Sequence, residues 1–183
     1  TVTATFALNE YTLTYTAGAN GSISGITPQT VSHGSDGAAV TAVPDEGYHF
    51  IKWSDGVITA TRTDKNVTGN ITVTATFAIN KYTLTYTAGA NGSITGTATQ
   101  TVNHESDGTA VTAVPDAGYH FVKWSDDVTT ATRTDENVTG NISVTAEFAK
   151  NEYTLTYAAG ENGSISGTAT QTVSHESDGT AVT

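Results

Sequence analysis

Acidic side chains in the turns are the first candidates for chemistry. Asp36, Asp45, Glu46, Asp55 and Asp64 fall between positions 36 and 64, and all but Asp64 stand next to glycine, serine or proline. Carboxylate oxygens are the ligands that Ca²⁺ prefers, so a calcium site is one reading. The chain has no D-x-[DN]-x-[DN]-G loop, however. We therefore expect solvated carboxylates that keep the protein soluble, with no cofactor, and keep Ca²⁺ as the alternative.

Histidines recur at two places. His33, His104 and His175 share one sequence context, and His49 and His120 share another. A metal site needs several ligands that converge, and His33 and His49 are 16 residues apart with no close partner. Ser, His and Asp are abundant, and no pattern selects a nucleophile. We predict histidines on strands or at the surface, no metal ligands, no catalytic residues and no enzymatic activity.

The two tryptophans allow two interpretations. Trp53 and Trp124 each follow a Tyr-His-Phe segment. An exposed Trp could stack on a sugar ring, which would suit a carbohydrate- or host-binding module. A Trp beside a Phe, in a stretch with few other large side chains, more often forms a core. The core interpretation is favoured, and the binding module stays open as an alternative.

Composition excludes several classes of protein. The 183 residues carry 7 Lys+Arg and 18 Asp+Glu, for a net charge of −11, and no Cys. Nucleic-acid binding is excluded because it needs clustered Lys and Arg to replace phosphate counterions. Without Cys there is no disulfide scaffold or thiolate zinc site. No apolar run approaches the ~18 residues of a membrane span, so we expect no membrane insertion.

The sequence repeats with a period of 71 residues. YTLTY begins at Tyr11, Tyr82 and Tyr153, and 55 of 71 positions are identical between 11–81 and 82–152. We divide the chain into the last strand and linker of a preceding repeat (1–10), two complete repeats (11–81 and 82–152) and the first part of a third (153–183). We expect it to be a window from a longer array.

Each repeat is typical of β structure. In Ile71–Ala78 the apolar side chains alternate with threonine, the period of a half-buried strand. The 38 threonines are then explained as the solvated face of the sheets. Asn20-Gly21 predicts a type I′ hairpin, and Pro44–Gly47 predicts a type I turn closed by glycine. We expect five or six short strands per repeat.

The order of these motifs resembles the internalin B-repeat, or Listeria–Bacteroides repeat, superfamily, in its divergent branch. The matching segments are YTLTY, QTVSHGSDG, AVPDEGYHFIKWSDG and NVTGNITVTATFA, and Gly47–Trp53 is similar to the family's Gly-Tyr-x-Phe-x-x-Trp signature. The resemblance implies a tandem array of small β-grasp-like modules in bacterial surface or secreted proteins. It also implies a role as spacer or adhesion module.

These observations predict a structural repeat region of a bacterial extracellular or cell-surface protein. It would act as a stalk or adhesin shaft, with the neighbouring repeats of the same chain as its partners. Linkers of about three residues, such as Ile79–Lys81, favour a stiff array. A second hypothesis is an extracellular filament, in which Thr1–Ala7 of one chain completes a neighbouring chain by strand pairing.

Overall fold

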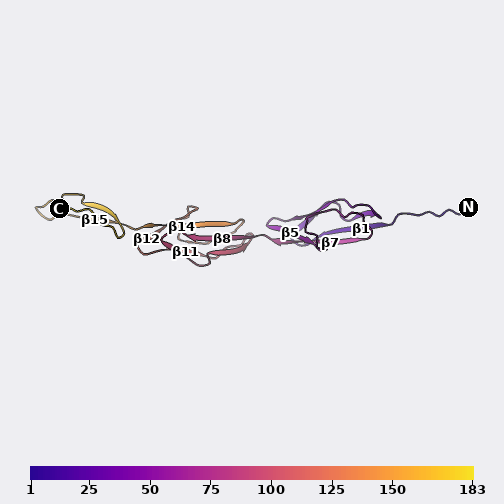
Figure 1. The fold of residues 1–183 in the computed structure, drawn as a ribbon, viewed down its shortest axis with the longest axis horizontal. Coiled ribbons are helices and arrows are strands. Elements are labelled where there is room, and N and C mark those ends of the chain that lie inside the picture. Colours follow the sequence, from indigo (N-terminus) through magenta and orange to yellow (C-terminus); the bar gives the residue numbers. More distant parts are fainter. The chain divides into compact units, whose positions relative to one another are not determined.

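The fold consists entirely of β-strands and connecting segments, with no helix (Figure 1). The computed structural model describes residues 1–183 and divides into two compact units, Thr1–Lys81 and Tyr82–Thr183. In the first unit the strands are β1 (Glu10–Ala17), β2 (Gly21–Ser24), β3 (Gln29–Ser32), β4 (Val40–Pro44), β5 (Tyr48–Trp53), β6 (Thr61–Arg62) and β7 (Ile71–Ile79). None of the secondary structure could cross a membrane as a helix.

The second unit repeats this order and then begins it again. Its complete repeat contains β8 (Lys81–Ala88), β9 (Gly92–Thr95), β10 (Thr99–Asn103), β11 (Val111–Pro115), β12 (Tyr119–Trp124), β13 (Thr132–Arg133) and β14 (Ile142–Lys150). The remaining stretch forms β15 (Glu152–Thr156) and β16 (Thr170–Ser174), which pair antiparallel. The fold is thus an all-β tandem array of small modules, as the period of 71 predicts.

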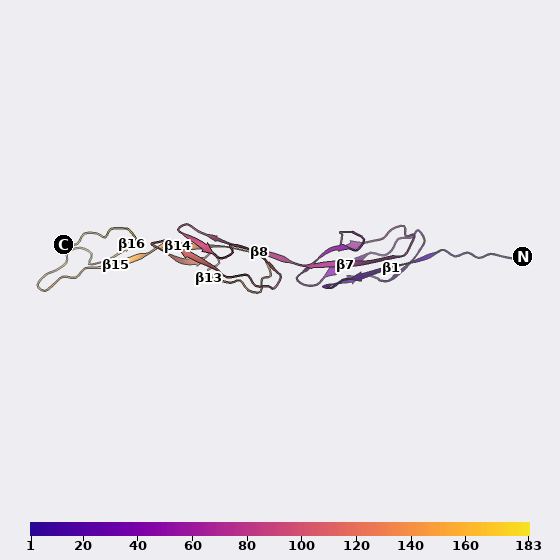
Figure 2. The same ribbon diagram turned by 90° about the horizontal axis from the view of Figure 1, so that it is seen from below.

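A four-stranded sheet in the order β3-β1-β7-β5 is the larger layer of the first repeat. Its two central strands, β1 and β7, are parallel, and they lie side by side in both ribbon views (Figure 1, Figure 2). The outer strands pair antiparallel, β3 with β1 and β5 with β7. The second repeat has the same order, β10-β8-β14-β12. The first and last strands of each repeat are therefore neighbours in its sheet.

A three-stranded sheet, β2-β4-β6, supplies the second layer of the repeat. Leu13, Trp53 and Val73 from the large sheet are buried in one cluster with Val40 and Ala42 from β4. Burial of these apolar side chains is the main force that holds so small a repeat together. The layer that covers the large sheet is made of strands.

Threonine lines the other face of the large sheet. In β7, Val73, Ala75 and Phe77 are buried, whereas Thr72, Thr74 and Thr76 between them are exposed. The prediction from alternation is confirmed. Threonine suits this face because its branched side chain fits the pleat while its hydroxyl stays hydrated.

Two local predictions are corrected by the structure. Each repeat has seven strands rather than five or six, because β6 contributes two paired residues that no alternation could reveal. The predicted type I′ hairpin at Asn20-Gly21 is wrong, since β1 and β2 belong to different sheets. Asn20 has φ 68°, but Gly21 is not among the residues with positive φ. A Cβ at Gly21 would lie 2.5 Å from the Phe77 ring, so close packing requires this glycine.

The turn predicted at Pro44–Gly47 exists one residue further along the chain. The Tyr48 amide donates to the Asp45 carbonyl at 3.1 Å, and Gly47 has φ 76°. This turn carries the chain from β4 in the smaller sheet to β5 in the larger one. Glycine is favoured there because other residues rarely adopt a positive φ.

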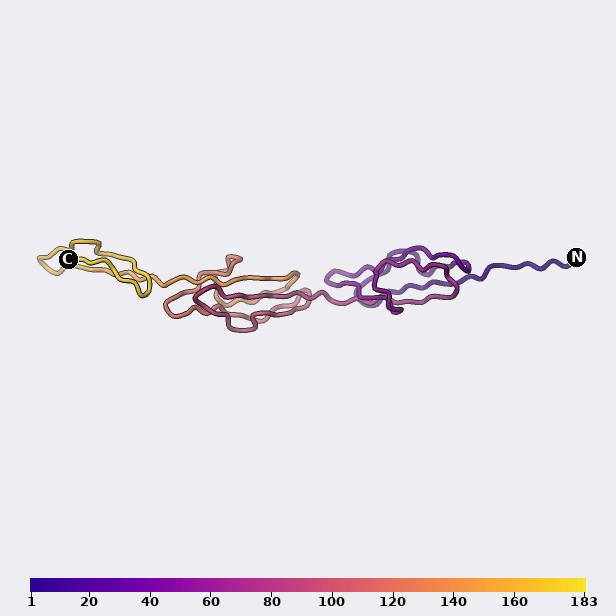
Figure 3. Tube along the Cα trace, viewed as in Figure 1, coloured from indigo at the N-terminus to yellow at the C-terminus, as the bar shows by residue number.

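The same sequence has different surroundings at the start of the first unit. Thr1–Ala7 repeats Thr72–Ala78, but it forms no strand, and it runs away from the sheets of its unit (Figure 3). Val2 is fully exposed, whereas its equivalent Val73 is buried in β7. Alternation in sequence thus specifies a strand only where neighbouring strands are available to pair.

Candidate functional site

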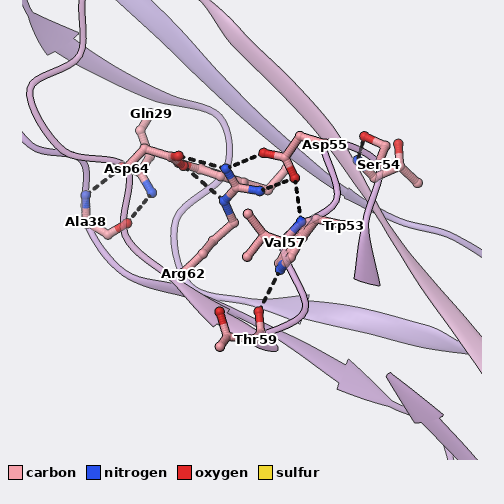
Figure 4. Close-up of polar contacts among 11 residues, drawn as sticks. Gln29, Ala38, Trp53, Ser54, Asp55, Val57, Thr59, Arg62 and Asp64 are labelled. Atoms are coloured by element: carbon pink, nitrogen blue, oxygen red, sulfur yellow. Dashed lines mark hydrogen bonds and ion pairs between the residues drawn. The ribbon is translucent and has the colours of Figure 1, made fainter. Parts of the chain in front are cut away.

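A buried arginine is the centre of the most polar site inside each repeat. Arg62 lies on β6 and is only 8% exposed. Its Nη1 and Nη2 donate to Oδ1 and Oδ2 of Asp55 at 3.2 and 2.9 Å (Figure 4). This bidentate geometry is the strongest that a guanidinium and a carboxylate adopt.

Asp64 binds the same guanidinium from another side. Arg62 Nε donates to Asp64 Oδ2 at 3.1 Å, and Nη2 donates to Oδ1 at 2.7 Å. The hydroxyl of Tyr15, on β1, donates to Asp64 Oδ2 at 2.6 Å. The network therefore ties the small sheet to the centre of the large one.

Aromatic rings enclose the guanidinium. The Arg62 Cζ atom lies 5.6 Å from the centre of the Tyr15 ring and 5.2 Å from the Trp53 ring. Both distances are within the range of cation–π attraction. Trp53 is itself held, because its Nε1 donates to the Thr59 carbonyl at 3.1 Å (Figure 4). We call Arg62, Asp55, Asp64, Tyr15 and Trp53 the arginine cluster.

Ionisation of the arginine cluster is set by burial and by these hydrogen bonds. The pKa of Asp55 is lowered, chiefly by the hydrogen bonds from Arg62. Burial acts to raise the pKa of Asp64, but the hydrogen bonds from Arg62 and Tyr15 outweigh burial and lower it. Burial and then the hydrogen bond to Asp64 raise the pKa of Tyr15. Burial acts to lower the pKa of Arg62, but its bonds to the two carboxylates raise it overall.

These shifts predict loss of stability in both acid and alkali. The folded-state pKa values of Asp55 and Asp64 are depressed, so their contribution is present above the unfolded value of about 3.9 and is lost as pH falls further. The raised pKa of Tyr15 makes its contribution present below the unfolded value of about 10 and lost as pH rises beyond it. Urea midpoints measured from pH 2 to 11 should show a plateau with a decline at each end.

A double variant, Asp55→Asn with Asp64→Asn, is the control for the acid limb. The variant retains two side chains of similar size but has no carboxylate to protonate. The first repeat of the variant should have a lower urea midpoint than the parent protein between the two declines. Its urea midpoint should also fall less steeply in acid. An acid limb of the same steepness in both proteins would contradict the assignment to these two residues.

The second repeat contains the arginine cluster again. Arg133 donates to Asp126 and Asp135, and Tyr86 donates to Asp135 at 2.6 Å. The spacing D-x6-R-x-D is the same in both repeats, and Arg62 and Arg133 are the only arginines of the chain. Sequence reasoning missed them as a site. The signal available was that both arginines stand at one repeat position with an aspartate on each side.

A buried glutamine fixes the crossing between the two sheets. The Gln29 side chain accepts a hydrogen bond from the Ala38 amide at 2.7 Å and donates to the Ala38 carbonyl at 3.0 Å (Figure 4). It thereby satisfies backbone groups that would otherwise be buried without partners. Gln100 and Gln171 make the same pattern of bonds in their repeats.

Of the acidic residues proposed for Ca²⁺, only Asp55 and Asp64 are brought together, and they meet on Arg62. Asp55 and Asp64 face Arg62, and Asp36 Oδ1 accepts the Asn66 amide at 2.8 Å. No group of three or more His, Cys, Asp or Glu side chains has the geometry to hold a metal ion. The expectation of solvated carboxylates is wrong for Asp64, whose side chain is only 17% exposed, because a buried arginine needs a buried counter-charge.

Both tryptophans are core residues, as expected. Trp53 and Trp124 are 0% exposed. Their rings pack edge-on against Tyr15 and Tyr86 respectively. A sugar could not stack on either ring without unfolding the repeat, so the binding-module alternative loses the residues on which it rested.

Histidines lie near the two ends of the repeat. His49, on β5, has its Nδ1 2.8 Å from Asn80 Oδ1. His33, just after β3, has its Nδ1 3.3 Å from the Tyr11 hydroxyl. His49 lies on a strand, as predicted, whereas His104, the counterpart of His33, lies just after β10 with a side chain that is only 12% exposed.

A single asparagine connects the complete repeat of the second unit to the stretch that follows it. The Asn151 amide donates to the Gly118 carbonyl at 2.9 Å, and its carbonyl accepts the His175 amide at 2.8 Å. Its side-chain Oδ1 lies 3.0 Å from His120 Nδ1. An open cavity of about 590 Å³ beside it is lined by His120, Ala149, Lys150, Asn151, Glu152 and Tyr153. This joint is held by backbone hydrogen bonds, and its cavity offers one cation and one carboxylate.

Comparison with known proteins agrees with this architecture. A family model described as the divergent InlB B-repeat domain matches residues 11–81 and again residues 82–152. Internalin H of Listeria monocytogenes serovar 1/2a is 36% identical over 120 residues, or 61% of this chain, and the chain spans about a fifth (21%) of that relative's length. No solved structure gives a significant match. The two family matches cover most of the sequence, and the chain therefore belongs to the divergent InlB B-repeat family.

Proposed function

We propose that these repeats are a non-enzymatic structural segment of a bacterial cell-surface protein, a stalk that holds another part of that protein away from the cell. The observation that carries the proposal is the construction of the repeat. Each complete repeat has its own core and its own arginine cluster. Only Asn80 stands between β7 and β8. Each further copy of such a self-contained repeat would add to the reach of the chain.

Family membership and surface chemistry support this proposal. One relative with a curated name is an internalin. A net charge of −11, with threonine on the open face of each large sheet, favours a soluble and well hydrated segment. In each complete repeat, two of the aspartates form ion pairs inside the repeat, with Arg62 or with Arg133.

Surface exposure and reach can be tested separately in the source bacterium. Antibodies raised against residues 1–183 should label intact cells, and protease added outside should remove the label. An in-frame deletion of residues 11–152 from the full-length gene should leave the protein at the surface. It should also reduce the access of large probes to the parts farthest from the cell. Labelling only after permeabilisation would refute the location, and unchanged access would refute the stalk.

A further inference from the structure

The first and last strands of each complete repeat form one parallel seam. In the first repeat, Leu13 to Ala17 of β1 pair with Ile71 to Ala75 of β7 in continuous register. The chain enters the repeat through β1 and leaves it through β7. The two ends of the repeat are therefore joined through the middle of its large sheet (Figure 2).

Parallel pairing decides how the seam meets a pulling force. Tension on the chain draws β1 toward its amino end and β7 toward its carboxyl end. Because the two strands run in the same direction, these forces are opposed along the strand axis. The strands must slide past each other, and the evenly spaced hydrogen bonds of a parallel ladder share the load. A force across the ladder would instead break the bonds one at a time.

Further contacts lengthen the seam at both of its ends. The Thr12 amide donates to Asn70 Oδ1 at 2.9 Å, so a side chain provides a bond where the backbone ladder has not yet begun. At the other end, the Gly18 amide donates to the Ala75 carbonyl at 2.9 Å. Thr16 Oγ1 donates to the Val73 carbonyl at 3.2 Å.

The seam is also protected from water on one side. Leu13 and Tyr15 of β1 and Val73 and Ala75 of β7 are buried in the core. Sliding would pull these side chains out of a packed layer, and Tyr15 is additionally held by Asp64. Rupture of the seam therefore requires the core to be broken at the same time.

The second repeat has the same seam. Leu84 to Ala88 pair in parallel with Ile142 to Ala146. The Thr83 amide donates to Asn141 Oδ1 at 2.9 Å, and the Gly89 amide donates to the Ala146 carbonyl at 2.8 Å. The two repeats differ at 16 positions, and the asparagine that extends the seam is identical in both.

We propose that the β1–β7 seam, with its copy β8–β14, is a load-bearing clamp that lets the repeats stay folded under tension along the chain. The proposal rests on the proposed role as a stalk and adds a property that reach alone does not require. A spacer needs only length. A clamp of this geometry suits a stalk that comes under tension when the part of the protein that it carries is bound to another surface.

Single-molecule pulling in two directions tests the clamp. The chain has no cysteine, so introduced cysteines are unique attachment points. Glu10→Cys with Lys81→Cys loads the first seam along its length. Glu10→Cys with Gly69→Cys pulls the same two strands apart from one end, and a side chain at Gly69 meets no atom within 4 Å.

The lengthwise pair should unfold at a several-fold higher force than the end-on pair at one loading rate. Each lengthwise event should release roughly 240 Å of chain, less the span of the folded repeat. The urea midpoints of the two variants should agree, which would show that a difference in unfolding force comes from the pulling direction and not from a difference in thermodynamic stability. If either variant fails to fold, the same comparison can be made in the second repeat. Lys81→Cys with Glu152→Cys is its lengthwise pair, and Lys81→Cys with Gly140→Cys is its end-on pair. A side chain at Gly140 also meets no atom within 4 Å.

Equal forces in both directions would overturn the clamp. That result would leave the stalk proposal standing, because surface labelling and probe access are measured on cells. Conversely, a strong clamp in a protein that never reaches the surface would refute the stalk and leave the mechanical inference intact.

Discussion

Arg62→Ala is expected to lower the free energy of unfolding of the first repeat by about 3–5 kcal/mol, the usual cost of removing one partner from a buried ion pair. The variant leaves Asp55 and Asp64 facing each other without a cation, and Tyr15 and Trp53 lose the guanidinium packed against both rings. Hydrogen exchange resolved by peptide should show the loss, because it separates the two repeats within one chain.

The second repeat is the control within the same molecule. Arg133 and its two aspartates are unchanged, so the hydrogen exchange of 82–152 should stay as in the parent protein.

The loss of stability on replacing each partner of Arg62 should follow how deeply that partner is buried. Asp64→Asn should cost more than Asp55→Asn, because the Asp64 side chain is 17% exposed and the Asp55 side chain 38%. An Arg62→Ala protein with parental exchange in both repeats would show that the cluster contributes nothing.

Trp53→Ala is expected to remove a large share of the stability of the first repeat, and to unfold it if that stability lies at the low end of the usual range. Removing a fully buried Trp costs about 3–5 kcal/mol. A domain of this size has a total stability of roughly 4–11 kcal/mol. Trp53 is 0% exposed and packs against Tyr15, Phe50 and Arg62, so its truncation leaves a cavity among these side chains.

The remaining tryptophan makes the measurement selective. In the Trp53→Ala protein, tryptophan fluorescence comes from Trp124 alone and should report an ordinary unfolding transition of the second repeat. Where the first repeat unfolds, far-UV circular dichroism should show the loss of about one repeat of strand structure. Ile58→Ala is the matched control, because Ile58 is 78% exposed and its truncation should change stability by no more than about 0.5 kcal/mol. A first repeat as stable in Trp53→Ala as in the parent protein would contradict the core role.

Local patterns predicted the strands well and the pairing between them poorly. The alternation in Ile71–Ala78 is enough to assign the buried and exposed faces of β7, because side chains on a strand alternate strictly. Asn20-Gly21 indicated a turn, and a turn is present. Whether the two strands on either side of this turn pair with each other depends on contacts that are distant in sequence. These are the packing of Gly21 against Phe77, 56 residues away, and the pairing of β1 with β7.

The arginine cluster shows the same limit. Asp55 and Asp64 were recognisable as acidic residues beside turns, but their environment was predicted as water. Seven residues separate Asp55 from Arg62 along the chain, and 49 separate Asp64 from Tyr15. The burial of Arg62, Tyr15 and the Asp64 side chain follows only when β6 is placed over the large sheet, whereas Asp55 stays partly exposed at the rim of the cluster.

The sequence by itself determined the period of 71 and the all-β class, because repetition and alternation can be read directly from the order of residues. The order of its motifs indicated the family by resemblance, and the scarcity of other large side chains indicated the core role of the tryptophans. The tertiary structure alone decided the seven strands of the repeat, the parallel β1–β7 seam and the buried ion pairs. Those features depend on contacts between residues far apart in sequence, whose energy appears only when the two sheets are packed together.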